Sequence, residues 1–485
     1  MSKNLASVLK EYPVFDLIRQ VSASTGVECY VVGGFVRDIL LHRPSKDIDI
    51  MCVGDGTALA RAVNRQAGKA SKKHSVKEYG RFGTAMMHYE DLEIEFVGAR
   101  KESYSHESRK PEVKEGTFED DINRRDFTIN ALAISLNEER FGELIDSFDG
   151  LKDLKRRVIR TPLDPGITFS DDPLRMMRAV RFATQLQFDI EPDTFQSIQD
   201  QSQRLSIISQ ERITDELNKI ILSPVPSYGF KLLFESHLLS QFFPEFVKLH
   251  GVETMDGKSH KDNFYHTLQV LDNVAKVSDS LWLRWAALLH DIAKPPTKRF
   301  HKKAGWTFHG HEDLGARMVP SIFRKMKLPL DEKMRFVQKL VKLHLRPIAL
   351  VKDTVTDSAV RRLLFEAGND VDSLMKLCRA DITSKNHNRV KRYLQNFDKV
   401  EKKLVEVEEK DKVRNFQPPV SGDEIMELFS LKPSRTVGEL KNELREAILD
   451  GAISNERQQA VEFIASLGEK KKLTINPHVL SKLRE

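Results

Sequence analysis

The fold of this chain is decided by residues 31–53, which read VVGGFVRDILLHRPSKDIDIMCV. An apolar run stops at Gly33 and Gly34, a short amphipathic segment follows, and a second apolar run carries Asp47 and Asp49. This order predicts a strand, a tight turn, a short helix and a second strand. Because residues two apart in a strand point to the same face, both carboxylates leave one surface, where they are costly without a positive partner. Divalent metals bind such carboxylates, so the stretch predicts a two-metal site for phosphoryl transfer.

A less specific interpretation of this stretch remains open, in which the glycine pair is only a turn and the aspartates face solvent on an edge strand. The combination of elements favours the metal site. Backbone N–H groups after Gly33 and Gly34, together with the Arg37 guanidinium, lie where a bound triphosphate needs them. A neighbouring strand predicted over residues 92–97 carries Glu93 and Glu95 on one face, and a two-metal site normally uses a third carboxylate on such a strand to bridge or orient the ions.

Composition is that of an ordinary soluble globular protein. The length of 485 residues suggests three or four domains, and 31% charged with 40% apolar residues is typical. A net charge of +6 permits an RNA partner without indicating one, because a nucleic-acid groove requires local clustering of charge. Three scattered cysteines, no signal-peptide run and no stretch of about twenty apolar residues predict a cytoplasmic protein without a membrane partner.

Three motifs carry a resemblance to a known family. Residues 33–38 (GGFVRD) followed by the DID strand, residues 94–100 (IEFVGAR) and residues 124–133 (RRDFTINALA) match it in order and spacing. They resemble the head domain of the class II CCA-adding enzymes, the bacterial tRNA nucleotidyltransferase and poly(A) polymerase family. The resemblance implies a nucleotidyl-transfer head in which Glu95 completes the metal-binding carboxylates.

The third motif supplies candidate nucleotide-binding residues. Two arginines beside an aspartate and an asparagine suit the polar groups of a nucleotide, although such a group by itself is usually surface charge. The resemblance implies that Arg124 and Arg125 bind phosphate, and that Asp126 and Asn130 support the ribose or a neighbouring loop. Residues 103–117 are polar, and we expect an irregular loop there, which in the family helps to switch nucleotide choice.

Residues 169–182 (FSDDPLRMMRAVRF) predict a helix that begins at an Asp-Pro step, with Asp172 as its cap. Arg175 follows three residues later, so we expect the two side chains on one helix face. Cytosine and adenine both present an amino donor beside a ring-nitrogen acceptor, so a carboxylate and a guanidinium would accept C and A and reject G and U. The alternative is a simple cap and an exposed charge. The resemblance favours base reading and places Arg178 in the same nucleotide site, with Asp171 standing where the family has Glu.

Residues 251–385 change in character, with seven of the fifteen histidines between positions 260 and 344. Imidazoles and carboxylates together suit a divalent metal at a hydrolytic centre. The segments LLHDIAKPPT, FHGHEDLGA and LCRADITSK resemble the HD phosphohydrolase superfamily. The resemblance leaves open the metal, the substrate and whether the domain is active. The expected ligands, enough for a second ion, are His266, His290, Asp291, His311, His344 and Asp381.

Together these observations predict an α+β fold. An N-terminal nucleotidyltransferase head with a small mixed β-sheet is expected to precede an all-helical neck, HD domain and tail. The expected domains are the head at 1–165, a neck for base recognition and RNA binding at 166–250, the HD domain at 251–400, and a helical tail that contacts tRNA at 401–485.

The resemblance implies a template-independent enzyme that adds CCA to tRNA 3′ ends from CTP and ATP. Asp47 and Asp49 would hold two Mg2+ ions, and the HD site a divalent metal of unknown identity. We expect tRNA, CTP and ATP as partners and no DNA. A poly(A) polymerase or a partial CC- or A-adding enzyme remains open, because the same Asp and Arg accept adenine alone. An HD phosphohydrolase whose head only binds RNA is the second alternative. The sequence gives no indication of oligomeric state.

Overall fold

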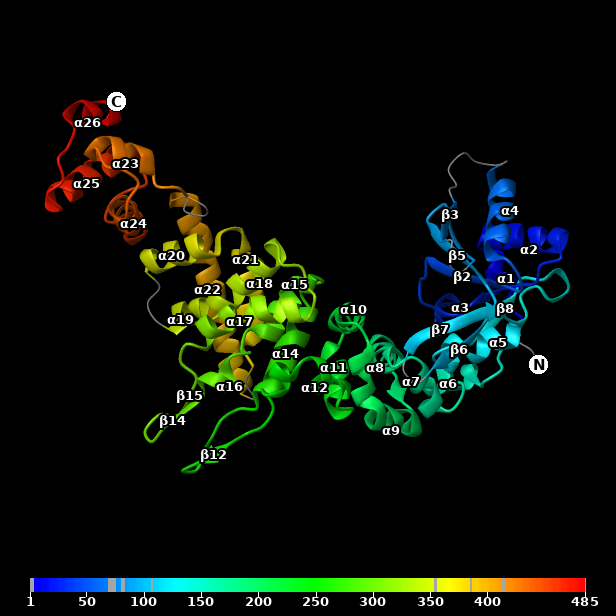
Figure 1. Cartoon of the computed structure of the whole chain (residues 1–485). Coiled ribbons are helices and arrows are strands. Elements are labelled where there is room, and N and C mark those ends of the chain that lie inside the picture. The colour runs from blue at the N-terminus through cyan, green and yellow to red at the C-terminus, as the bar shows by residue number, and fades with distance from the viewer. Residues whose placement is uncertain are drawn as a thin grey trace. The chain divides into compact units, whose positions relative to one another are not determined.

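The computed structural model describes residues 4–68, 76–79, 83–105, 108–352, 356–383, 386–411 and 416–484. They form two compact units, Met1–Pro244 and Glu245–Glu485 (Figure 1). The first unit contains a β-sheet with helices, and the second consists of helices with two short hairpins. The predicted α+β class, with the sheet in the N-terminal part and helices after it, is confirmed.

A mixed sheet occupies the N-terminal part of the first unit, coloured blue to cyan in Figure 1. Among the described residues its strands follow the spatial order β3-β4-β5-β2-β1-β8-β9. Strands β2 and β5 pair in parallel, whereas the other neighbours pair antiparallel. The strands are β1 Cys29–Val32, β2 Asp47–Cys52, β3 Val76–Tyr79, β4 Thr84–Tyr89, β5 Leu92–Gly98, β8 Ala133–Ser135 and β9 Leu144–Ile145.

The alternation of residue types along β2 explains how the sheet is buried on one face. Ile48 and Ile50 are fully buried, whereas Asp47 is exposed and Asp49 is half-buried. All four residues of β1 are buried, as expected for a central strand with apolar contacts on both faces. The short helix between the two strands is α3 Gly34–Leu40, which buries Phe35. The order of strand, turn, helix and strand predicted from residues 31–53 is therefore present.

The remaining helices of the first unit either cover the sheet or follow it. Helix α4 packs against β4 and β5, and the helices from α7 onward lead away from the sheet. Their bounds are α1 Ala6–Leu9, α2 Pro13–Thr25, α4 Gly56–Gly68, α5 Phe118–Asn123, α6 Gly150–Arg156, α7 Pro165–Asp171, α8 Leu174–Leu186, α9 Pro192–Gln201, α10 Gln210–Ile221, α11 Pro226–Glu235 and α12 Leu238–Phe242.

One sequence prediction in this unit needs correction. Part of the loop expected at residues 103–117 is a hairpin, in which β6 Arg100–Ser105 pairs antiparallel with β7 Ser108–Glu115; residues 106 and 107 lie outside the described part. Backbone hydrogen bonds of a hairpin do not depend on apolar side chains, so the polar sequence concealed it. The helix predicted to begin at the Asp-Pro step is present as α8, which starts at Leu174, and another helix, α7, ends just before the step at Asp171. Asp172 is extended, with φ −136° and ψ 97°, because a residue before proline avoids the helical region.

The second unit is built from helices α14 to α26. Two short hairpins interrupt them, formed by β12 Thr254–Met255 with β13 Lys258–Ser259 and by β14 Arg299–His301 with β15 Gly305–Thr307. Among the described residues, no helix has the length and apolar character needed to cross a membrane. The helices are α14 Asn263–Ala275, α15 Leu281–Leu289, α16 Lys294–Thr297, α17 His311–Lys325, α18 Glu332–Leu343, α19 Leu345–Lys352, α20 Asp357–Ala367, α21 Val371–Asp381, α22 His387–Asp411, α23 Gly422–Phe429, α24 Arg435–Asp450, α25 Arg457–Lys470 and α26 Pro477–Arg484.

Candidate functional site

Two neighbouring strands bring the predicted carboxylates together. In the parallel pairing of β2 with β5, Asp49 lies opposite Glu95. Because Ile48 and Ile50 point into the core, the side chains of Asp47 and Asp49 leave the other face of β2. Asp49 and Glu95 are half-buried and Asp47 is exposed. The structure therefore places all three carboxylates on one face of the sheet.

A cavity of about 180 Å³ opens beside these carboxylates, and its lining includes Asp49, Glu95 and Arg125. Burial raises the pKa of Asp49; the charge of Arg125 opposes this rise and the charge of Asp47 adds to it. Burial also raises the pKa of Glu95, with the nearby charge of Asp49 as the second cause. Carboxylates that repel one another in a partly dry site fit a divalent cation, which takes carboxylate oxygens as ligands.

The glycine pair brings the backbone close to this site. Gly33 has φ +75°, a conformation that L side chains rarely adopt. A Cβ atom there would lie 3.1 Å from Asp49 Oδ2 and 3.2 Å from Arg125 Nη1. Gly34 follows as the first residue of α3. Glycine at position 33 is thus required both by the turn and by the close approach of the two charged groups.

A buried aspartate that the sequence reading missed orients the two arginines of the third motif. Arg124 donates from Nε and Nη2 to Asp121 Oδ1 at 2.9 and 2.6 Å, and Arg125 Nη2 donates to Oδ2 at 2.9 Å. Burial tends to raise the pKa of Asp121, but the charges of Arg125 and Arg124 outweigh it and the pKa is lowered. Asp121 precedes the arginines by three and four residues, a spacing that could have indicated the contact. Both guanidinium groups are thereby held at the cavity wall.

A second network lies beneath these arginines. Arg37 Nη1 donates to Asn130 Oδ1 at 2.9 Å, Asn130 Nδ2 donates to Asp126 Oδ1 at 3.0 Å, and Arg178 Nε donates to Asp126 Oδ2 at 2.8 Å. Arg37 also donates twice to Asp38 and is buried. Burial opposes ionisation of Asp126, but Arg178 and Asn130 lower its pKa to about 2. These four predicted residues therefore connect α3 to α8, and none of them is among the residues that line the cavity beside Asp49.

An aromatic ring supports this network, and the sequence reading did not include it. The guanidinium carbons of Arg37, Arg178 and Arg181 lie 5.1, 5.4 and 4.1 Å from the ring centroid of Phe182. Arg181 pairs with the buried Glu216 at 2.7 Å. A ring face attracts cations, so Phe182 holds three arginines in one place without neutralising them.

The predicted base-reading pair does not lie on a shared helix face. Asp172 precedes α8, and its Oδ1 accepts the Leu174 N–H at 3.1 Å. Arg175 is buried, and its Nη2 donates to the carbonyl oxygen of Arg124 at 2.6 Å. Asp172 therefore caps α8, as predicted, but it lies outside the helix that carries Arg175. Arg175 nevertheless contacts the backbone of a residue that lines the cavity.

All six predicted residues of the HD set come together in the second unit. They form two groups whose ligand atoms lie within 4.8 Å of one another: His266, His290 and Asp381, and Asp291, His311 and His344. Asp291 joins the groups, with its Oδ2 at 3.2 Å from His290 Nε2 and its Oδ1 at 3.2 Å from His311 Nε2. Asp381 Oδ1 lies 2.9 Å from His266 Nε2. Residues from five different helices or their ends thus converge on one centre.

The hydrogen bonds of three of these imidazoles show that they suit a metal. The Nδ1 atoms of His290, His311 and His344 lie 2.7, 2.7 and 2.6 Å from backbone carbonyl oxygens. A carbonyl oxygen only accepts, so Nδ1 carries a proton in each ring, and in a neutral ring Nε2 then keeps its lone pair. Burial opposes the charged form of His290, but the charges of Asp291 and Asp381 raise its pKa to about 10, whereas burial lowers the pKa of His344 to about 4. These three Nε2 atoms are buried without a hydrogen-bond partner among the described residues. Oriented, buried nitrogen acceptors beside carboxylates fit one or more divalent metal ions.

Both candidate sites lie in regions of the chain that match known protein families. Residues 29–160 match the poly A polymerase head domain, residues 187–249 the probable RNA and SrmB-binding site of polymerase A, and residues 263–384 the HD domain. A crystal structure of the Bacillus stearothermophilus CCA-adding enzyme in complex with CTP superposes with a TM-score of 0.66 over 94% of this chain and 97% of that one. At 24% identity this likeness concerns the fold alone.

Sequence relatives establish the family. The A-adding tRNA nucleotidyltransferase of Deinococcus radiodurans is 34% identical over 363 residues, which are 73% of this chain and 80% of the relative. The CCA-adding enzyme of Lactobacillus helveticus is 38% identical over 241 residues, 49% of this chain and 56% of the relative. With the head, RNA-binding and HD regions all matched, the chain belongs to the family of CCA- and A-adding tRNA nucleotidyltransferases.

Proposed function

We propose that this enzyme adds the complete CCA sequence to tRNA 3′ ends from CTP and ATP in the cytoplasm, without a nucleic-acid template. The observation that carries the proposal is the pairing of Asp49 with Glu95 beside a cavity that Arg125 lines. Nucleotidyl transfer requires such a carboxylate face for metal ions next to cations for a triphosphate. Solved structures of CCA-adding enzymes are described with CTP, with ATP and with tRNA, which supports the same substrates here.

In the proposed reaction the 3′ hydroxyl oxygen of the RNA attacks the α-phosphorus of the nucleotide, and pyrophosphate leaves. Asp47, Asp49 and Glu95 would hold two Mg2+ ions, which supply activation of the hydroxyl and stabilisation of the leaving group when bound. Arg124 and Arg125 bind the triphosphate oxygens, and Asp121 keeps both guanidinium groups directed to the cavity.

We further propose that Asp172 and Arg175 read the base, by a route that differs from a shared helix face. Arg175 donates to the Arg124 carbonyl oxygen, which is an acceptor like the ring nitrogen of cytosine or adenine. Exchange of one acceptor for the other would leave the guanidinium satisfied in both states. Guanine and uracil offer a donor at that position and are rejected.

The central test replaces one carboxylate. Asp49→Asn keeps the shape of the side chain and removes its charge, so we expect nucleotide addition to fall by roughly a thousandfold or more while folding is kept. Incorporation of labelled CTP and ATP into tRNA that lacks its CCA end measures this loss. If Asp49→Asn adds nucleotides as fast as the unchanged protein, the head serves only to bind RNA and the proposal is wrong.

A second candidate is an enzyme that adds only the terminal adenosine, and the Deinococcus radiodurans relative favours it. The two candidates differ in a single experiment with tRNA ending before the first C and tRNA ending in CC. A CCA-adding enzyme extends both substrates when CTP and ATP are present. An A-adding enzyme extends only the CC-ended tRNA and does not incorporate CTP. Tailing of arbitrary RNA with ATP alone would identify a poly(A) polymerase.

For the HD centre we propose a metal-dependent phosphohydrolase activity on phosphorylated RNA ends. The support for metal binding is that His290, His311 and His344 are buried, with Nδ1 held by a carbonyl oxygen and Nε2 facing the other ligands. Metal content of the purified protein, measured by elemental analysis, is the first test. We expect His311→Ala to lower the bound metal and leave CCA addition unchanged. A protein that binds no metal, and whose hydrolysis survives this substitution, would contradict the proposal.

A further inference from the structure

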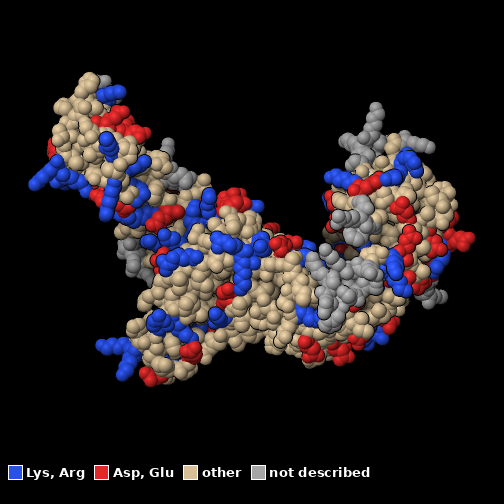
Figure 2. Space-filling model, viewed as in Figure 1, with Lys and Arg blue, Asp and Glu red and all other residues tan. Residues whose placement is uncertain are grey.

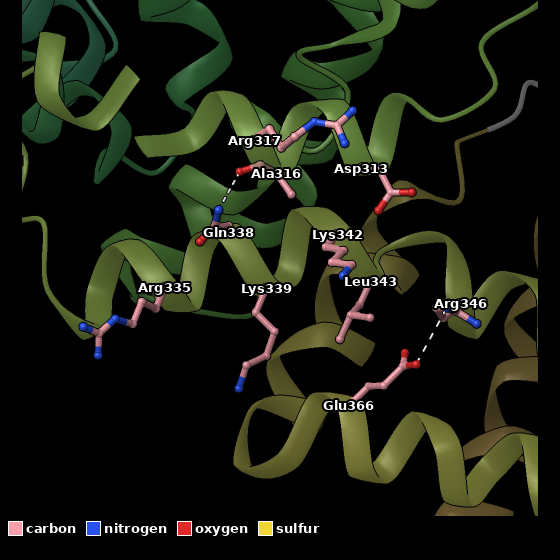
Figure 3. A pocket seen from close by; sticks show the side chains of 10 residues that line it. All are labelled: Asp313, Ala316, Arg317, Arg335, Gln338, Lys339, Lys342, Leu343, Arg346 and Glu366. Atoms are coloured by element: carbon pink, nitrogen blue, oxygen red, sulfur yellow. Dashed lines mark hydrogen bonds and ion pairs between the residues drawn. The ribbon is translucent and has the colours of Figure 1, made fainter. Parts of the chain in front are cut away.

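A basic groove lies on the second unit, between α17 and the helices α18 to α20. Its volume is about 550 Å³, and Figure 3 shows the side chains that line it. Two apolar residues of the lining, Ala316 and Leu343, are buried. Five cations stand against two carboxylates around the groove; the cations are Arg317, Arg335, Lys339, Lys342 and Arg346. The lining is therefore strongly positive.

The segment that contributes most of the groove has an excess of positive charge. Residues 311–352 contain ten Lys and Arg but only four Asp and Glu, an excess of six. The complete chain has 77 Lys and Arg and 71 Asp and Glu, also an excess of six. Figure 2 shows several groups of Lys and Arg side chains on the visible face of the second unit. This segment has the local clustering that net charge alone did not reveal.

Three of the groove cations have no carboxylate partner among the residues that the structure describes. Lys339 Nζ lies 2.5 Å from Asp370 Oδ2, and its charge is offset there. In contrast, Arg317, Arg335 and Lys342 are exposed and form no ion pair with any residue in the described ranges. Their charge is thus available to a ligand.

The arrangement suits an extended polyanion and not a single phosphate. Arg335 and Arg346 are eleven residues apart on consecutive helices, about 16 Å along a helical path. In Figure 3 the ends of Arg335 and Lys339 point away from that of Arg317 and do not converge on one point. A nucleic-acid strand carries a charge about every 3.4 Å, so a row of cations matches successive phosphates.

A hydrogen bond joins the two helices on either side of the groove, and the sequence of α17 explains why it forms. Pro320 lies inside this helix and has no N–H, so the carbonyl oxygen of Ala316 lacks its helical donor. Gln338 Nε2 on α18 donates to this oxygen at 2.9 Å across the groove. The hydrogen bond therefore joins α17 to α18 at the Ala316 carbonyl oxygen, which would otherwise lack a donor.

We propose that this groove binds the phosphodiester backbone of the tRNA substrate through Arg317, Arg335 and Lys342. The inference rests on the proposed function, because it assumes that tRNA is the substrate. It assigns part of tRNA binding to the helices of the HD domain, outside both centres where chemistry is expected. The groove then contributes affinity and orientation without contacting the reacting atoms.

The test measures binding of fluorescent tRNA lacking its CCA end to the full-length protein by anisotropy, over about 50–200 mM salt. The double variant Arg335→Gln/Lys342→Gln removes two exposed charges. We expect its Kd to rise roughly tenfold at about 100 mM salt, and the slope of log Kd against log salt to fall by about 1.5. Arg335→Lys/Lys342→Arg should bind like the unchanged protein, because it keeps the charges.

A matched control removes two exposed lysines elsewhere in the same unit, as Lys276→Gln/Lys376→Gln, and should leave Kd within about twofold. The rate of nucleotide addition at saturating tRNA should be equal in all variants. If the unchanged protein binds tRNA and the groove variant shows the same Kd and slope, the groove does not bind RNA, as expected if it serves an acidic protein partner. If the unchanged protein neither binds nor extends tRNA, the proposed function fails first.

Discussion

The buried Asp121 gives the sharpest test of how the nucleotide site is held. Its Oδ1 accepts two hydrogen bonds from Arg124 and its Oδ2 accepts one from Arg125. Asparagine has one carbonyl oxygen, so Asp121→Asn serves only one arginine and presents N–H groups to the other. A hydrogen bond to a charged group contributes about 1.5–3 kcal/mol, so we expect the free energy of unfolding to fall by about 2–4 kcal/mol.

The same substitution releases a guanidinium group from the cavity wall, and nucleotide binding should weaken. We expect the KM for ATP and for CTP to rise roughly tenfold, equivalent to about 1.4 kcal/mol, with a smaller change in kcat. Urea unfolding followed by circular dichroism gives the stability, and steady-state nucleotide addition gives KM.

Asp153 provides a matched control in the same unit. It is also buried, it accepts from Thr128 Oγ1 at 2.6 Å and from Arg160 Nε at 2.9 Å, and it does not line the cavity. Both of these bonds end on Oδ2, which the amide oxygen of asparagine can replace, so Asp153→Asn should lose less stability than Asp121→Asn and keep the KM for both nucleotides. If the two variants share the same KM, Asp121 has only a structural role and the positioning of the arginines is refuted.

Other predictions follow from single contacts. The pKa of Asp126 is lowered from 3.8 to about 2. Its contribution to stability is therefore complete above about pH 4 and is lost as the pH falls through 2. Arg178→Gln should lower the free energy of unfolding by roughly 2 kcal/mol at neutral pH and move acid unfolding, measured by circular dichroism, to higher pH. Gly33→Ala places a Cβ within about 3 Å of two charged groups at positive φ, and should cost about 1–2 kcal/mol in urea unfolding and lower kcat for nucleotide addition. Gln338→Leu should lower the free energy of unfolding by about 1–3 kcal/mol, because it leaves the Ala316 carbonyl of α17 without a donor. The loss should be much smaller when Pro320→Ala restores the helical donor. If the effects of the two substitutions add in the double variant, this pairing is contradicted.

The head could be predicted from sequence wherever local periodicity decides the structure. Asp47 and Asp49 alternate with isoleucines, so their shared face follows from the strand period alone. The parallel pairing that sets Asp49 beside Glu95 is a contact between distant segments, and only the family motif indicated it. Asp121 was missed because its acidic neighbours in the same helix made it look like surface charge, although it is fully buried.

The base-reading region shows where a spacing rule fails. The interval between Asp172 and Arg175 counts as one helical turn only if both residues are helical, and the proline at position 173 prevents this for the first of them. The restriction before proline was available from the sequence and agrees with the role of Asp172 as a helix cap, because a capping residue is itself non-helical. Where Arg175 points was not available, because its partner is a backbone carbonyl 51 residues away.

The HD centre shows why a ligand set is easier to predict than its chemical state. Histidines and aspartates were visible in the sequence, but the proton on each ring depends on a carbonyl that any residue carries. His290, His311 and His344 each use the carbonyl oxygen three residues earlier. For His290 and His344 this carbonyl lies in the last turn of a helix, where carbonyl groups have no helical donor. A histidine placed just after a helix therefore finds an acceptor for Nδ1, and its Nε2 lone pair is left for a metal. Placement at the helix end, more than the histidine itself, makes His290 and His344 suitable as candidate ligands.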